Sequence, residues 1–338
     1  MLVNAMVNAM KKSIVFFLLI LILMSVVFTG CGKTMVSSVI FLTGCGKSTA
    51  SPAPGNTNSP SSSGTSSQKP GRGSTLCVLT CSADGTKVSE NSSAVIDYSN
   101  GAEGYIQVNY TGSSQKVKLQ ITTPEDTTYT YSLHGGYETF PLTGGSGTYH
   151  VGVYENISGS QYSTALSADL KITITNEFGP YLYPNQYVNF ADSKTAIQQS
   201  EKLAETTDSD LDVVTNVYNF MISNFTYDYD KAESVASGYL PDVDATLASK
   251  NGICFDYSAL MATMLRVQSI PTRLEVGYVG DVYHAWISVY IKDIGWVNGI
   301  IQFDGTDWRM LDPTFASTSK NPKKFIPDNN DYLLKYVY

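Results

Sequence analysis

Three residues in the last third of the chain have the side chains that perform acyl transfer when they lie together: Cys254, His284 and Asp312. A cysteine thiolate attacks a carbonyl carbon, a histidine takes up the thiol proton, and a carboxylate orients the imidazole ring. Each residue also has an ordinary explanation: an inert core cysteine, a partly buried histidine, or an aspartate that caps a helix or forms a turn. Which elements carry the three residues, and whether those elements bring them together, decides between a chemical role and simple packing.

Cys254 is predicted to lie in the first turn of a buried helix. Apolar residues recur at intervals of three and four from Tyr257 to Leu265, and Pro271 follows the pattern, as is typical of a helix and its end. The unpaired N–H groups and the dipole of a first helical turn stabilise a thiolate. Gly252 permits an abrupt turn into the helix. This placement favours a nucleophile.

Strands are predicted to carry the other two side chains. Alternation in the stretch 283–291 puts its odd-numbered, mostly apolar residues on one face and therefore His284 and Trp286 on the other. A strand is also expected over Leu274–Tyr278, and another over 308–312, where the following proline stops it. Asp312 would then lie at a strand end, where an antiparallel neighbour could bring it beside His284.

The same part of the chain resembles the transglutaminase-like superfamily of papain-type cysteine enzymes. The matching segments follow the order of that family over about sixty residues: Gly252–Leu260, Leu265–Arg266, Ser269–Arg273, Tyr283–Trp286 and Met310–Thr314. The resemblance implies a helix packed on an antiparallel sheet. It also implies Cys254 as nucleophile, His284 as base and acid, and Asp312 as the residue that orients His284.

The expected function is cell-surface, cysteine-dependent acyl transfer on a peptide or protein amide, which makes the chain a peptidase, an amidase or a cross-linking enzyme. The residues leave open whether water or an amine resolves the acyl-enzyme. The competing interpretation is a non-catalytic binding or structural module that keeps the fold. The backbone N–H of Cys254 would form half of an oxyanion hole. No cofactor is expected.

The N-terminal segment is interpreted as an export signal. Lys11 and Lys12 precede an apolar run, Ile14–Phe28, that is shorter than the roughly 20 residues of a membrane span. A Thr-Gly-Cys sequence ends at Cys31 and again at Cys45, and both resemble the bacterial lipobox, whose cysteine is lipidated. We therefore expect a lipid anchor on Cys31 or Cys45 at the outer face of the bacterial membrane; an uncleaved membrane anchor is the alternative.

The whole chain is expected to be an α+β protein with four parts: a signal peptide with lipobox (1–45), a flexible Ser/Pro/Gly-rich linker (46–81), a β-sandwich (82–180) and, as the resemblance implies, a transglutaminase-like domain (190–338). In the sandwich region, Val117, Leu119 and Ile121 alternate with polar residues, and glycine turns separate similar stretches. This pattern predicts an antiparallel sandwich of immunoglobulin-like type.

The remaining features exclude some partners and leave others open. The net charge is −8, which argues against nucleic acid. Cys77 and Cys81 form a disulfide only if the chain turns between them, and they lack further ligands for zinc. The acidic residues at 208, 210 and 212 lack the glycine and glutamate of a calcium loop. No metal is expected, and the oligomeric state is not predicted.

Overall fold

The structure is a computed structural model and describes residues 71–279, 281–292, 295–298, 300–303, 308–311 and 332–338. The predicted signal peptide, most of the linker, both candidate lipidation sites (Cys31 and Cys45) and Asp312 lie outside the described residues. None of the helices in the described ranges has the length and apolar character needed to cross a membrane.

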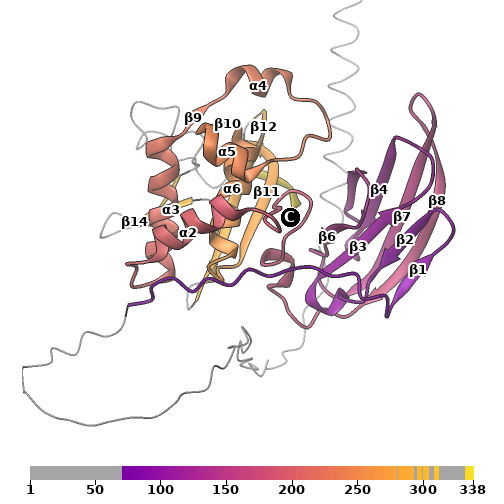
Figure 1. The fold of residues 1–338 in the computed structure, drawn as a ribbon, viewed down its shortest axis with the longest axis horizontal. Coiled ribbons are helices and arrows are strands. Elements are labelled where there is room, and N and C mark those ends of the chain that lie inside the picture. The colour runs from indigo at the N-terminus through magenta and orange to yellow at the C-terminus, as the bar shows by residue number, and fades with distance from the viewer. Residues whose placement is uncertain (1–70, 280, 293–294, 299, 304–307, 312–331) are drawn as a thin grey trace, which may run out of the picture. The chain divides into compact units, whose positions relative to one another are not determined.

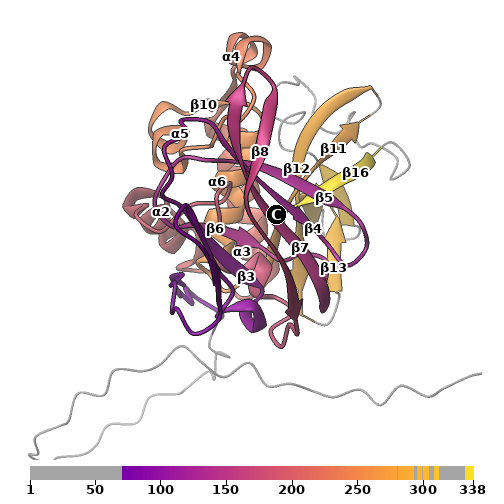
Figure 2. The ribbon, with the colours of Figure 1, turned by 90° about the vertical axis from the view of Figure 1, so that its right-hand side faces the viewer.

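The region after the linker is built from two antiparallel sheets of four strands each (Figures 1 and 2). One sheet has the order β1-β2-β3-β6, and the other has the order β5-β4-β7-β8. The strands are β1 (Val88–Glu90), β2 (Ala94–Asp97), β3 (Tyr105–Tyr110), β4 (Val117–Thr122), β5 (Thr128–Leu133), β6 (Glu138–Pro141), β7 (Gly147–Ser158) and β8 (Gln161–Ile172).

Alternation explains how these sheets form a core. In β4, Val117, Leu119 and Ile121 are buried, while Lys118 and Gln120 between them are partly exposed. Buried side chains from both sheets belong to one hydrophobic cluster. The predicted all-β character of this region is confirmed, and its immunoglobulin-like topology stays a prediction. The only helix described between β1 and β8 is the short 3-10 helix η1 (Gly101–Glu103).

A connection containing the 3-10 helix η2 (Gly179–Tyr181) leads to the α+β region. Its helices are α2 (Lys194–Ala204), α3 (Asp210–Asn224), α4 (Tyr229–Ser234), α5 (Val243–Ser249) and α6 (Cys254–Arg266). Two short strands, β9 (Thr226–Tyr227) and β10 (Asn251–Gly252), pair in parallel just before α6. Ser209 caps α3 by accepting a hydrogen bond from the Asp212 backbone N–H. Asp210 and Asp212 lie in that first turn, where acidic side chains interact favourably with the helix dipole.

The main sheet of this region has the antiparallel order β13-β12-β11-β16. Its strands are β11 (Thr272–Val279), β12 (Val282–Ile291), β13 (Gly295–Asn298) and β16 (Tyr332–Val337). A separate pair is formed by β14 (Ile300–Phe303) and β15 (Trp308–Leu311). The predicted strand that leads to Asp312 is thus present as β15, but its described partner is β14 and not the strand of His284.

Helix α6 is the central element of the α+β region. Every residue from Asp256 to Arg266 is buried, because α6 packs against α2, α3 and α5 and also against β11 and β12 (Figure 1). The predicted helix is confirmed, and Cys254 is its first residue. Burial on all sides fixes the direction of the helix axis and with it the position of Cys254.

Candidate active site

Local packing in front of α6 places Cys254 at the helix start. Ile253 is extended (φ −96°, ψ 175°), and the helix begins at the next residue. A Cβ at Gly252 would lie 2.9 Å from the Cβ of Asp256, which is closer than real Cβ contacts. Gly252 is therefore needed for this close approach, a more specific reason than the freedom to turn that the sequence suggested.

Asp256 organises the first turn of α6, and sequence reasoning did not identify it as important. Its carboxylate is fully buried and accepts three hydrogen bonds: from the Ile253 backbone N–H (2.9 Å), from Lys231 Nζ (2.7 Å) and from the Tyr239 hydroxyl (2.5 Å). The sequence signal that could have identified Asp256 was a charged residue in an otherwise apolar helix, two residues after Cys254. The backbone around Cys254 is thereby tied to the segment 231–239.

The electrostatics of this cluster favour the paired, charged state of the lysine. Burial lowers the pKa of Lys231, but hydrogen bonds from Lys231 to Asp256 and Tyr239 outweigh it, so the pKa of Lys231 lies above its ordinary value. Burial first, and then the hydrogen bond to Asp256, raise the pKa of Tyr239. The phenol therefore stays protonated and can keep donating its hydrogen bond.

His284 comes from β12, directly opposite Gly277 of β11. Its side chain is buried (5% exposed). A Cβ at Gly277 would lie 2.1 Å from the Leu333 carbonyl oxygen of β16 and 3.0 Å from the ring of Trp286. Only a residue without a Cβ allows β11 to approach β16 this closely at position 277. The sequence pattern did not reveal this requirement.

The predicted strand is confirmed as β12, but both of its faces are covered: every residue from His284 to Val289 is buried. Trp286 is 4% exposed, and its ring lies 6.5 Å from that of His284 at 25°. Trp286 Nε1 and the Ser288 hydroxyl donate to the same oxygen of Glu275, at 2.7 and 2.6 Å. Burial raises the pKa of Glu275. This buried network fixes the ring next to His284.

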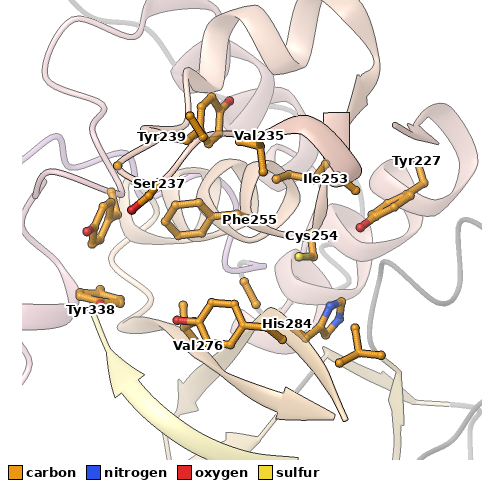
Figure 3. A pocket seen from close by; sticks show the side chains of 17 residues that line it. Tyr227, Val235, Ser237, Tyr239, Ile253, Cys254, Phe255, Val276, His284 and Tyr338 are labelled. Atoms are coloured by element: carbon orange, nitrogen blue, oxygen red, sulfur yellow. The ribbon is translucent and has the colours of Figure 1, made fainter. Parts of the chain in front are cut away.

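Cys254 and His284 line the same cavity of about 530 Å³. Figure 3 shows the Cys254 thiol entering the cavity from the N-terminal end of α6 and the His284 imidazole entering it from the facing strand. The structure therefore brings together two of the three predicted catalytic residues, from segments thirty positions apart in sequence. The third, Asp312, lies outside the described residues. A thiol and an imidazole in one cavity can form a nucleophile and its proton carrier.

A loop that was not predicted to take part forms another wall of this cavity. The lining includes the segment Val235–Tyr239, which follows α4, and also Tyr227 of β9. Tyr239 is held to Asp256 from this loop. Such a wall brings together residues that are distant in sequence, so no single spacing indicates it.

The other cysteines have different surroundings. Cys81 is a free thiol, so the local Cys77–Cys81 disulfide that the sequence left open does not form. Its Sγ lies 3.5 Å from the Pro184 carbonyl oxygen, in donor geometry, and burial raises its pKa to about 11. Within the described ranges, no group of three or more His, Cys, Asp or Glu residues is arranged to hold a metal ion.

Comparison with known families and sequences bears on this region. Residues 197–299, which include Cys254 and His284, match the family described as the transglutaminase-like superfamily. The chain is also 27% identical over 149 residues to the uncharacterized protein YebA of Bacillus subtilis strain 168. That match covers 38% of this chain and only 20% of YebA.

Two solved structures are among those to which the chain shows similarity. A proposed cysteine protease from Cytophaga hutchinsonii is 13% identical, with a TM-score of 0.35, and the match covers 75% of this chain and 74% of that one. The periplasmic domain of TgpA from Pseudomonas aeruginosa is 15% identical, with a TM-score of 0.34 and coverage of 71% and 78%. The chain has a mixed α+β structure that contains a transglutaminase-like domain.

Proposed function

We propose that the chain catalyses cysteine-dependent acyl transfer on peptide or protein amides at the cell surface. One observation carries the proposal: a thiol at the first residue of a buried helix and a buried histidine on the adjoining sheet line one cavity. Both residues fall in the segment that matches the transglutaminase-like superfamily. The fold positions each group through buried neighbours, as a site for chemistry requires.

In the first half of the reaction, His284 takes the proton of Cys254, and the thiolate attacks the amide carbonyl. A carbon–sulfur bond forms, and the carbonyl oxygen becomes an oxyanion, to which the Cys254 backbone N–H donates. The carbon–nitrogen bond then breaks, and His284 returns the proton to the leaving amine. The product is an amine and a thioester on Cys254. Asp312 is proposed to orient His284.

In the second half, water or an amine attacks the thioester and releases Cys254. Water gives hydrolysis, the outcome of a peptidase or amidase, and an amine gives transamidation, the outcome of a cross-linker. Both outcomes use the same acyl-enzyme and the same two residues. Product analysis with and without a primary amine separates them.

The proposal is tested with a thiol-directed activity probe and a panel of peptide amides, with and without amine acceptors. We expect labelling and turnover for the native protein and for Cys81→Ala, which removes the other free thiol of the described residues. Both signals should be lost in Cys254→Ala. Turnover that survives Cys254→Ala would refute the nucleophile. No labelling or turnover in the folded native protein would favour a non-catalytic module.

We also propose that the protein is exported and tethered by a lipid on Cys31 or Cys45. The support is the apolar run Ile14–Phe28 and the two lipobox-like sequences that follow it. Intact-mass spectrometry of protein from a bacterial membrane should find an acylated cysteine as the first residue. Finding both cysteines present and unmodified would contradict the proposal.

A further inference from the structure

Aromatic side chains form one side of the candidate cavity. Tyr187, Phe255, Tyr283 and Tyr338 all line it, and we call these four residues the aromatic wall. The ring centroids of Tyr187 and Phe255 lie 5.3 Å apart, and those of Tyr187 and Tyr338 lie 4.7 Å apart. Figure 3 shows Phe255 and Tyr338 on the opposite side of Cys254 from Tyr227. An aromatic surface therefore begins next to the candidate nucleophile.

The described part of the cavity lining offers no carboxylate, ammonium or guanidinium group to a substrate. Among the described residues that line it there is no Asp, Glu, Lys or Arg. Burial raises the pKa of Tyr187 to about 12 and also raises the pKa of Tyr283, so these phenols are neutral near pH 7. Lys231 and Asp256 pair with each other. A charged substrate group entering the cavity would lose hydration without finding an opposite charge on these described acidic or basic side chains.

The size and lining of the cavity suit a large apolar group. Its volume of about 530 Å³ lies within the roughly 300–1,000 Å³ typical of sites that enclose small ligands. Val235, Ala236, Ser237 and Gly238 also line the cavity, with side chains that are short or absent. This combination leaves space and presents apolar surface at once.

The aromatic wall is supported from behind. Tyr131 of β5 is 2% exposed, and its ring lies 5.6 Å from that of Tyr187 and 6.0 Å from that of Tyr338. Next to Tyr187, Gln186 Nε2 donates to the Ser132 carbonyl oxygen at 2.7 Å. These contacts hold the rings before any ligand binds, which lowers the entropy cost of binding.

We propose that the acyl donor carries an aromatic or other large uncharged side chain on the residue whose carbonyl Cys254 attacks, and that this side chain binds against the aromatic wall. The proposal rests on the proposed function for the position of the carbonyl. The binding preference itself can be measured without turnover.

The test uses the full chain with Cys254→Ala, so that binding is measured and no reaction occurs. Isothermal titration calorimetry compares four peptides, acetyl-Gly-Gly-X amide, in which X is Phe, Leu, Asp or Lys. We expect the Phe peptide to bind about tenfold or more tightly than the Asp and Lys peptides, with Leu between them. Adding Phe255→Leu should weaken the Phe peptide several-fold.

Tyr137→Leu is the matched control, because Tyr137 is 49% exposed and does not line the cavity; binding should be unchanged. Thermal unfolding confirms that each variant is folded. Equal or tighter binding of the Asp or Lys peptide would overturn the proposal, and so would no binding of any peptide at millimolar concentration. If the Phe peptide is preferred but the native protein shows no turnover, only the proposed function is refuted. If the native protein shows turnover but no preference among the peptides, only the proposed aromatic specificity is refuted.

Discussion

Replacing Asp256 should destabilise the α+β region strongly, because its carboxylate holds three groups at once. Asp256→Ala removes the acceptor for the Ile253 N–H, the Lys231 ammonium and the Tyr239 hydroxyl. Hydrogen bonds to a charged group each contribute roughly 1.5–3 kcal/mol, and breaking a buried ion pair costs about 3–5 kcal/mol. Lys231 is 29% exposed, so water compensates part of its loss. We expect a decrease of about 3–5 kcal/mol in the free energy of unfolding.

Urea titration followed by tryptophan fluorescence measures this change. All three tryptophans, at 286, 296 and 308, lie in the C-terminal region, so their emission reports its unfolding. Asp230→Ala is the matched control, because Asp230 is an exposed carboxylate in the first turn of α4. It should change stability by no more than about 0.5 kcal/mol.

A double-mutant cycle with Lys231→Met tests whether the two charges act together. The double variant Lys231→Met/Asp256→Ala should be at least about 1 kcal/mol more stable than the sum of the single effects predicts. This follows because each single variant leaves a partner charge uncompensated, while the double variant removes both. Strict additivity, or a cost below about 1 kcal/mol for Asp256→Ala, would refute the buried cluster as the anchor of the first turn.

Three further predictions concern other buried groups. Arg266 is 1% exposed and donates to the carbonyl oxygens of Thr272, Tyr183 and Tyr338. Arg266→Met should therefore lower the free energy of unfolding, measured by urea titration, by at least about 3 kcal/mol. A smaller decrease would contradict the stabilising role of these three hydrogen bonds. Burial raises the pKa of Glu275 above its ordinary 4.5, so its contribution to stability is present below that pH and is lost as pH rises through the folded pKa. The stability of Glu275→Gln relative to native should therefore increase from acidic to neutral pH; a flat difference would contradict it. Because the pKa of Cys81 is raised to about 11, roughly one Cys81 thiol in ten thousand is ionised at pH 7. The rate of Cys81 alkylation, followed by peptide mapping, should therefore rise about tenfold per pH unit. Fast alkylation of Cys81 at pH 7 would contradict this prediction.

The elements that carry the candidate site could be predicted because each has a strong periodic pattern. The three-and-four spacing after Cys254 gave the helix, and the period of two gave the paired strands β11 and β12. Local patterns of this kind depend on neighbours within a few residues. The position of the pattern and the glycine before it placed Cys254 in the first turn of the helix.

The surroundings of the site could not be predicted, because they depend on contacts between distant segments. The pairing of Lys231 with Asp256 joins residues 25 positions apart, and no spacing rule indicates such a pair. The need for glycine at 277 arises from the approach of Leu333 on β16. The burial of Trp286 was missed because alternation distinguishes two faces of a strand but does not say whether another part of the chain covers the second.

The central claim is tested most directly by acid-quenched intact-mass spectrometry with an acyl donor whose acyl group leaves the enzyme slowly, such as an acetyl-Gly-Gly-Phe thioester. The account predicts a transient mass increase equal to the acyl group, mapped by fragmentation to Cys254 and reduced strongly in His284→Gln. Cys81→Ala should leave the adduct unchanged. A folded native protein that releases product without an adduct on Cys254, or that carries the adduct on another residue, would contradict the claim.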